Sequence, residues 1–203
     1  MSEGRSGEAE GGGSLQGGVE RQSQATPRVV SSQPVYSGRV VSLRVDEIAL
    51  PQGGTARREV VDHPGAVVVA AVDESGCVYL VRQYRHPIRR DLLELPAGGL
   101  EPGEDPLSAA QRELREEVGL VADKWTPLGW FFSSPGFANE RLHAFLAQGL
   151  TAVSTNPDDD EDLVIVRRPL PDLLRSPQDT PDAKTLATLF LLQRVVPSLA
   201  KAS

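Results

Sequence analysis

The segment 98–120 limits the possible folds more than any other part of the sequence, and it reads GGLEPGEDPLSAAQRELREEVGL. Its two ends predict an α-helix over residues 106–118. Asp105 suits the N-cap, Pro106 suits the first helical position, and Gly119 suits the left-handed residue that closes a helix. Four apolar residues recur at helical spacing and predict one face buried against a sheet: Leu107, Ala110, Leu114 and Val118.

Three glutamates share a neighbouring arc of this predicted helix. Because a helix turns about 100° per residue, Glu117 lies about 40° from Glu113, and Glu116 lies about 60° to the other side. Like charges at these spacings destabilise a helix by about 0.2–0.5 kcal/mol per pair. A solvated acidic face is one explanation, as for most charge runs. The other is a bound divalent cation such as Mg²⁺, which prefers oxygen ligands.

The spacing of these and neighbouring residues favours the bound cation. The segment follows the pattern G-x5-E-x7-R-E-U-x-E-E-x-G-U, where U is aliphatic, and it resembles the signature of the Nudix hydrolases. The resemblance implies an α/β fold, the Nudix α/β/α sandwich with a mixed sheet. It also implies hydrolysis of a diphosphate with Mg²⁺, for which Mn²⁺ could substitute. The matching residues are Gly98, Glu104, Arg112, Glu113, Leu114, Glu116, Glu117, Gly119 and Leu120.

Individual roles follow from the same resemblance. Glu113 and Glu117, with the backbone carbonyl of Ala97, are expected to hold the metal. Glu116 is expected either to bind a further metal or to take the proton from the attacking water. The resemblance gives Arg112 the role of orienting these carboxylates without touching the substrate.

A second acidic group lies in residues 156–162, which read NPDDDED. A solvated, flexible loop is one explanation. In the ADP-ribose pyrophosphatase branch of the Nudix family, this loop carries a catalytic base and a metal ligand separated by one residue. By register with Leu163, the matching residues are Asp159 as the base and Glu161 as the ligand. Asp159 stands where the branch often has Glu, so its side chain is one methylene shorter.

Three further segments resemble the same branch: residues 57–59, residues 83–85 and residues 93–99. The resemblance implies that Arg85 contacts the diphosphate and that Glu140 lines the ribose side. Arg58 is expected to reach the adenine side of the substrate from a partner chain. The reason is that enzymes of this branch are typically homodimers with exchanged amino-terminal hairpins.

The rest of the chain divides into a tail and one domain. Residues 1–34 are rich in Gly, Ser, Gln and Glu, which predicts a disordered tail. Residues 35–200 are expected to form the Nudix domain, including an amino-terminal β-hairpin over residues 38–61. Apolar runs at 66–72 and 78–83 predict a second, more deeply buried hairpin. The other predicted elements are strands at 92–95, 124–132, 141–150 and 163–167 and a helix at 183–196.

Composition argues against several classes of protein. The chain has 28 acidic and 21 basic residues and a net charge of −7, which argues against a general nucleic-acid binder. The longest apolar run, 66–72, is far shorter than the ~20 residues of a membrane-spanning helix, so no membrane partner is expected. The single cysteine, Cys77, cannot form an internal disulfide and fits a reducing, cytoplasmic compartment.

These features together predict a Mg²⁺-dependent enzyme that hydrolyses ADP-ribose to AMP and ribose 5-phosphate. One alternative is the same chemistry on another nucleoside diphosphate sugar or on NADH. A second alternative is a non-catalytic Nudix domain that senses ADP-ribose. Sensors of that kind usually have damaged motif carboxylates, whereas Glu113, Glu116 and Glu117 are intact in this sequence.

Overall fold

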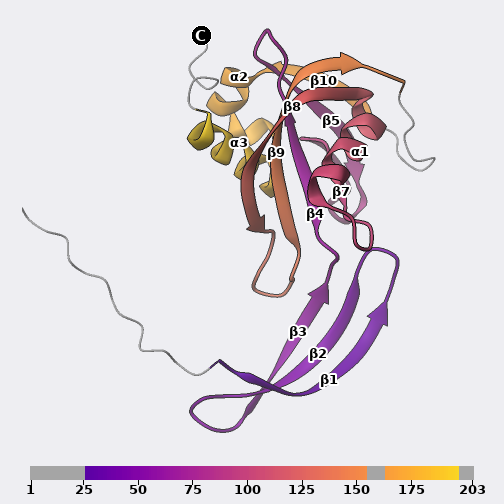
Figure 1. Ribbon diagram of the computed structural model, residues 1–203. Helices are drawn as coiled ribbons and strands as arrows, with labels where there is room; N and C mark the ends of the chain where they lie inside the picture. The colour runs from indigo at the N-terminus through magenta and orange to yellow at the C-terminus, as the bar shows by residue number, and fades with distance from the viewer. Residues whose placement is uncertain (1–25, 155–162, 197–203) are drawn as a thin grey trace, which may run out of the picture.

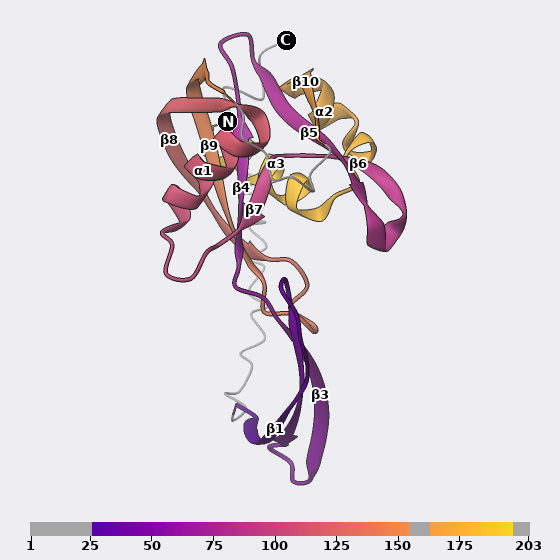
Figure 2. The same cartoon turned by 90° about the vertical axis from the view of Figure 1, so that its right-hand side faces the viewer.

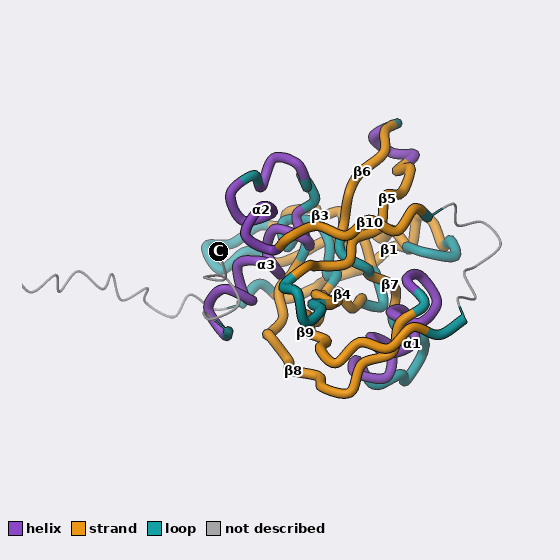
Figure 3. The backbone as a smooth tube through the Cα atoms, turned by 90° about the horizontal axis from the view of Figure 1, so that it is seen from above, coloured by secondary structure: helices purple, strands orange, loops and turns teal. Residues whose placement is uncertain are grey.

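The computed structural model describes residues 26–154 and 163–196. The strands of these residues form three sheets, and helices pack on both faces of the central sheet (Figures 1 and 3). The predicted base Asp159 and the predicted ligand Glu161 fall in the acidic segment 155–162, which lies outside the described residues.

An antiparallel sheet opens the described chain, with strands β1 (Arg28–Ser37), β2 (Ser42–Ala49) and β3 (Thr55–Asp62) in that order. This sheet projects away from the rest of the molecule (Figures 1 and 2). In the turn between β2 and β3, Gly53 and Gly54 have φ angles of 93° and 81°, which residues with a side chain rarely adopt. The pairing of β2 with β3 confirms the predicted amino-terminal hairpin.

The predicted end of the disordered tail was wrong. Residues 28–34 belong to β1, which pairs with β2 from Arg28 opposite Ala49 to Ser37 opposite Ser42. All ten residues of β1 are exposed, so backbone hydrogen bonds to β2, rather than apolar burial, order this strand. Composition indicates how much apolar surface a segment can bury. It therefore did not reveal an exposed edge strand that backbone hydrogen bonds hold in place.

The central sheet is mixed and has the order β7-β4-β9-β8. Its strands are β4 (Ala66–Ala71), β7 (Ala97–Gly99), β8 (Leu120–Phe132) and β9 (Arg141–Ala152). Strand β4 pairs in parallel with β9, and the other neighbouring pairs are antiparallel. Every residue of β4 is buried, as expected of a strand covered on both faces. Val67 and Val69 point to one core, and Val68 and Ala70 point to the other.

A second antiparallel sheet has the order β10-β5-β6, with strands β5 (Cys77–Arg85), β6 (Arg90–Glu94) and β10 (Val164–Pro169). The predicted hairpin between residues 66–72 and 78–83 was therefore wrong, because these runs lie in different sheets. Both edges of β4 are taken, by β7 and β9, so no free edge is left for β5. A single antiparallel bridge, between Val72 and Val78, links the two runs.

Two long helices cover the central sheet, α1 (Pro106–Val118) on one face and α3 (Ala183–Val195) on the other (Figure 3). Asp105 caps α1 by accepting hydrogen bonds from the backbone N–H groups of Leu107 and Ser108. Gly119 closes α1 with a φ angle of 69°. These caps confirm the predicted helix, and helices on both faces of a mixed sheet confirm the predicted α/β/α sandwich.

A short helix and two 3₁₀ turns complete the described elements: α2 (Leu170–Arg175), η1 (His86–Ile88) and η2 (Pro177–Asp179). The sequence did not predict α2, whose six residues are too few for a helical spacing pattern to appear. Among the described residues, no helix is both long enough and apolar enough to cross a membrane.

Candidate functional site

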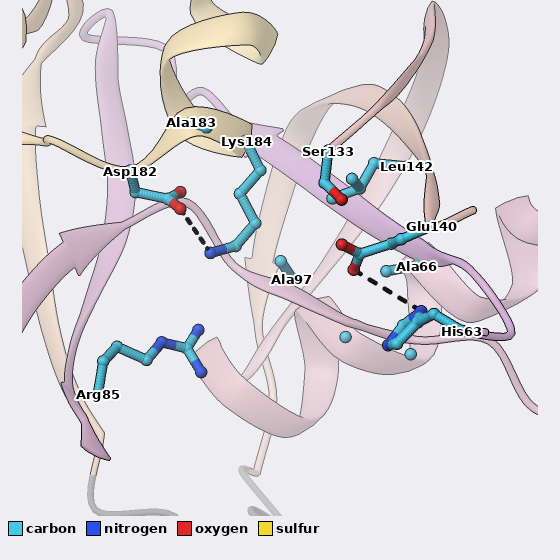
Figure 4. Close-up of a pocket in the computed structure, with 12 residues that line it drawn as sticks. His63, Ala66, Arg85, Ala97, Ser133, Glu140, Leu142, Asp182, Ala183 and Lys184 are labelled. Atoms are coloured by element: carbon cyan, nitrogen blue, oxygen red, sulfur yellow. Dashed lines mark ion pairs between the residues drawn. The ribbon is translucent and has the colours of Figure 1, made fainter. Parts of the chain in front are cut away.

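A cleft of about 730 Å³ lies beside α1. Arg112, Glu113 and Glu116 of α1 line it together with Gly98 of β7 and Arg85 of β5. A neighbouring side cavity of about 370 Å³ shares several of these lining residues and extends to the beginning of α3 (Figure 4). The segment that the sequence singled out therefore lies at a hollow in the surface.

Two of the three predicted acidic residues are buried, and one of them, Glu113, lines the cleft. Glu113 is 9% exposed and Glu117 is 6% exposed, although both carry a carboxylate. Glu117 accepts a hydrogen bond from the backbone N–H of Ala97 at 3.0 Å, so the structure brings this pair of predicted metal ligands together. Glu116 is more exposed, and its side chain faces the same cleft.

Arg112 connects the carboxylates of this region. Its Nε and Nη2 groups donate to both carboxylate oxygens of Glu104 at 3.0 Å. Its Nη1 group donates to Glu113 at 2.6 Å and to Glu116 at 3.1 Å. The hydrogen bond to Glu104, followed by the charge of Glu113, raises the pKa of Arg112 despite partial burial, while Arg112 lowers the pKa of Glu104. One cation thus fixes the orientation of several anions.

Gly98 supplies the space in which Glu113 lies. A Cβ atom at residue 98 would be 1.9 Å from Oε1 of Glu113 and 2.0 Å from its Cδ. Because this position has no side chain, the Glu113 carboxylate can lie directly against the backbone of β7. Glycine at the first position of the signature therefore has a steric reason in this chain.

The oxygen donors of Glu113, Glu117 and the Ala97 backbone fit a hard divalent cation, because carboxylate and carbonyl oxygens are the ligands that such ions prefer. Within residues 26–154 and 163–196, no three acidic, histidine or cysteine side chains are grouped closely enough to hold an ion by themselves. Among the described residues, further ligands would be backbone carbonyl groups, with water in addition.

Arg85 is a cation that lines both the cleft and the side cavity. It makes two hydrogen bonds to Glu94, from Nε at 2.9 Å and from Nη2 at 2.7 Å. Sequence reasoning selected Arg85 but gave no role to Glu94 or to Lys184, which pairs with Glu94 from α3. Glu94 stands within the segment 93–99 that resembled the family, whereas no local pattern pointed to Lys184.

Glu140, which is predicted to line the ribose side of the substrate, lines the side cavity, and its Oε1 is 3.7 Å from Nδ1 of His63 (Figure 4). His63 lines both hollows and was missed, because its position depends on contacts between distant segments. Its backbone N–H donates to the side chain of Asn139, next to Glu140.

Arg58 lies apart from the other predicted site residues. It is in β3 and faces a separate hollow that Val45 and Phe137 also line. Its Nη1 group donates to the backbone oxygen of Arg57 at 2.9 Å. Arg58 lines neither the cleft nor the side cavity of its own chain.

Comparison with known proteins identifies the class to which this fold and site belong. The family model described as "NUDIX domain" matches residues 61–189, and the chain belongs to this family. Nudix hydrolases generally need a divalent metal, which agrees with the carboxylates of Glu113 and Glu116 in the cleft.

Individual relatives are similar over most of the chain. An ADP-ribose pyrophosphatase of Bacillus subtilis (strain 168) is 40% identical over 170 residues, which cover 82% of this chain and 92% of the relative. A methanol dehydrogenase activator of Bacillus methanolicus is 39% identical with the same coverage. The crystal structure of an ADP compounds hydrolase has a TM-score of 0.78 at 25% identity and covers 89% of this chain and 100% of that one.

Proposed function

We propose that this protein hydrolyses ADP-ribose to AMP and ribose 5-phosphate with Mg²⁺. The observation that carries the proposal is the arrangement of the cleft, which the carboxylate of Glu113 and the cationic Arg85 both line, with buried Glu117 hydrogen bonded to the backbone of Ala97, another lining residue. Such a site offers a place for metal ions beside a group that binds phosphate. The similarity to enzymes named for ADP-ribose and ADP compounds supports this choice of substrate.

In this proposal, Glu113, Glu117 and the carbonyl oxygen of Ala97 would hold the cation, joined by Glu161 from the acidic segment. A bound divalent cation supplies charge neutralisation for the phosphates and lowers the pKa of a coordinated water. Mn²⁺ has similar ligand preferences and is expected to replace Mg²⁺.

The chain's own residues then act on water and substrate. Water attacks one phosphorus of the diphosphate, and a carboxylate accepts the proton that the water loses. Asp159 or Glu116 takes this role, and Arg112 orients Glu116 and Glu113 through its hydrogen bonds. The bond from that phosphorus to the bridging oxygen breaks, which releases AMP and ribose 5-phosphate. Arg85 binds the diphosphate, and Glu140 contacts the ribose.

Incubation of the purified chain with ADP-ribose and Mg²⁺ is expected to release AMP and ribose 5-phosphate in equal amounts. Excess EDTA should abolish this release, and added Mg²⁺ or Mn²⁺ should restore it. A panel of nucleotide sugars and NADH, at the same concentrations, compares the alternative substrates through kcat/KM. Binding of ADP-ribose without any turnover in Mg²⁺ would contradict the proposed hydrolase activity and favour a non-catalytic domain that senses ADP-ribose.

We also propose a homodimer in which the amino-terminal hairpins are exchanged. The projecting sheet and the position of Arg58, outside both hollows of its own chain, support this arrangement. Arg58 would then contact the adenine side of a substrate bound to the partner chain.

Mixing two impaired variants tests this exchange. Arg58→Ala is expected to raise KM by about tenfold through a lost charged contact, and Glu117→Gln is expected to be nearly inactive. In an exchanged dimer that contains one chain of each kind, one cleft has both Glu117 and Arg58. Co-expression of the variants should therefore recover wild-type KM in part of the sites. If Arg58 serves its own cleft, the mixed dimers would recover nothing.

We infer a reducing, cytoplasmic compartment from cysteine usage. Cys77 is a free, partly buried thiol at the beginning of β5.

A further inference from the structure

Glu94 is a charged residue with almost no access to solvent. It ends β6, is 1% exposed, and accepts two hydrogen bonds from the guanidinium of Arg85 in a forked arrangement. Lys184, from the first turn of α3, forms an ion pair with the same carboxylate. Burial alone raises the pKa of Glu94, but Arg85 and Lys184 outweigh that effect and leave the pKa below its usual value.

A second carboxylate completes this group. Asp182 lies 3.1 Å from the ammonium of Lys184, and its side chain caps α3 by accepting from the backbone N–H of Thr185 (Figure 4). The four side chains of Arg85, Glu94, Asp182 and Lys184 form what we term the Glu94 cluster. Two cations and two anions give the cluster no net charge, so it adds little overall attraction for an anionic substrate.

The segment that follows Glu94 is hydrogen bonded to α3, β4 and α1. The backbone N–H of Leu95 donates to the hydroxyl of Thr185 at 2.9 Å. The backbone oxygen of Pro96 accepts from Val69 at 2.9 Å. The next residue, Ala97, donates to Glu117 at 3.0 Å. Glu94 thus binds Arg85, and Ala97 binds Glu117 of α1. The two residues between them are hydrogen bonded to α3 and to β4.

We propose that Glu94 is a positioning residue that holds the Arg85 guanidinium in the orientation that binds the diphosphate. The inference rests on the function proposed above. The fork with Glu94 uses two of the five N–H groups of Arg85, and the guanidinium lines both hollows. Lys184 supports Glu94 from α3. Arg85 cannot rotate without breaking its hydrogen bonds to a carboxylate that is almost fully buried.

A role in positioning Arg85 and a role based on the net charge of the cluster predict opposite effects of Glu94→Gln on substrate binding. The change makes the Glu94 cluster positive by one unit, so a role based on charge alone predicts tighter binding of an anionic substrate. A glutamine amide has one oxygen and one NH₂ group and cannot accept both hydrogen bonds of the fork. A positioning role therefore predicts weaker binding.

The test uses the full chain and compares Glu94→Gln with the wild type. We expect KM for ADP-ribose to rise about tenfold while kcat changes less than about threefold, since Arg85 binds the ground state and the transition state alike. Calorimetry with a non-hydrolysable α,β-methylene analogue of ADP-ribose should show the same loss of affinity. Glu94→Asp, which keeps the charge but shortens the side chain, should also raise KM and serves if Glu94→Gln folds poorly.

A double-mutant cycle separates positioning from a general structural role. In an Arg85→Ala background, Glu94→Gln should raise KM less than about twofold, because its effect passes through Arg85. Glu74→Gln is the matched control, since Glu74 is an exposed turn residue that lines neither hollow.

The possible results are distinct. An unchanged or lower KM for Glu94→Gln, or a full effect in the Arg85→Ala background, would overturn the positioning role. A wild-type chain that neither binds nor cleaves ADP-ribose would overturn the proposed function and the inference that rests on it.

Discussion

Glu117→Gln is expected to lower the turnover of ADP-ribose by about a thousandfold without weakening the fold. The glutamine oxygen can still accept the hydrogen bond from the Ala97 backbone, which Glu117 accepts at 3.0 Å. What the variant loses is the negative charge that a divalent cation requires. Because Glu117 is 6% exposed and lies four residues after Glu113 on the same helix, removal of its charge also lowers a cost of burial and repulsion.

Three measurements on this variant separate catalysis from folding. AMP release should fall, calorimetric binding of Mn²⁺ in the presence of the methylene analogue should weaken, and the midpoint of thermal unfolding should stay the same or rise. Glu74→Gln removes a carboxylate from an exposed turn outside both hollows and should match the wild type in all three. Full turnover by Glu117→Gln would show that this carboxylate does not hold the metal.

The sequence predicted the parts of the site that local contacts fix. The ends of α1 follow from Asp105 and Gly119, which act on backbone groups a few residues away. Given the helix, the angles between Glu113, Glu116 and Glu117 follow from helical geometry alone. The acidic side of the cleft was therefore predictable, residue by residue.

Contacts between distant residues were not predictable in the same way. Lys184 reaches Glu94 across 90 positions of sequence, and the same separation divides Thr185 from Leu95. Hydrophobic patterning identified residues 66–72 as a strand but could not choose its partners, and β4 pairs with β9 instead of β5. A single sequence shows which residues prefer burial or a turn, whereas strand pairing depends on the whole chain.

Gly98→Ala is expected to reduce turnover by at least about a hundredfold, through steric displacement of Glu113. The new Cβ would lie 1.9 Å from Oε1 of Glu113, far inside a normal contact. Glu113 has little room to move away, because it is 9% exposed and hydrogen bonded to Arg112 at 2.6 Å. Gly98 is not among the glycines with a positive φ, so alanine should not strain the backbone.

Gly99→Ala provides the matched comparison for this variant. A Cβ at Gly99 would meet no atom within 4 Å, so the same methyl group is added one residue away without the collision. We expect Gly99→Ala to keep turnover within about fivefold of the wild type and Gly98→Ala to lose both turnover and Mn²⁺ affinity. Equal activity of the two variants would mean that the Glu113 carboxylate does not lie against Gly98 during the reaction. Since the only difference between them is which backbone position carries the methyl group, the comparison isolates the space that Gly98 leaves for this carboxylate.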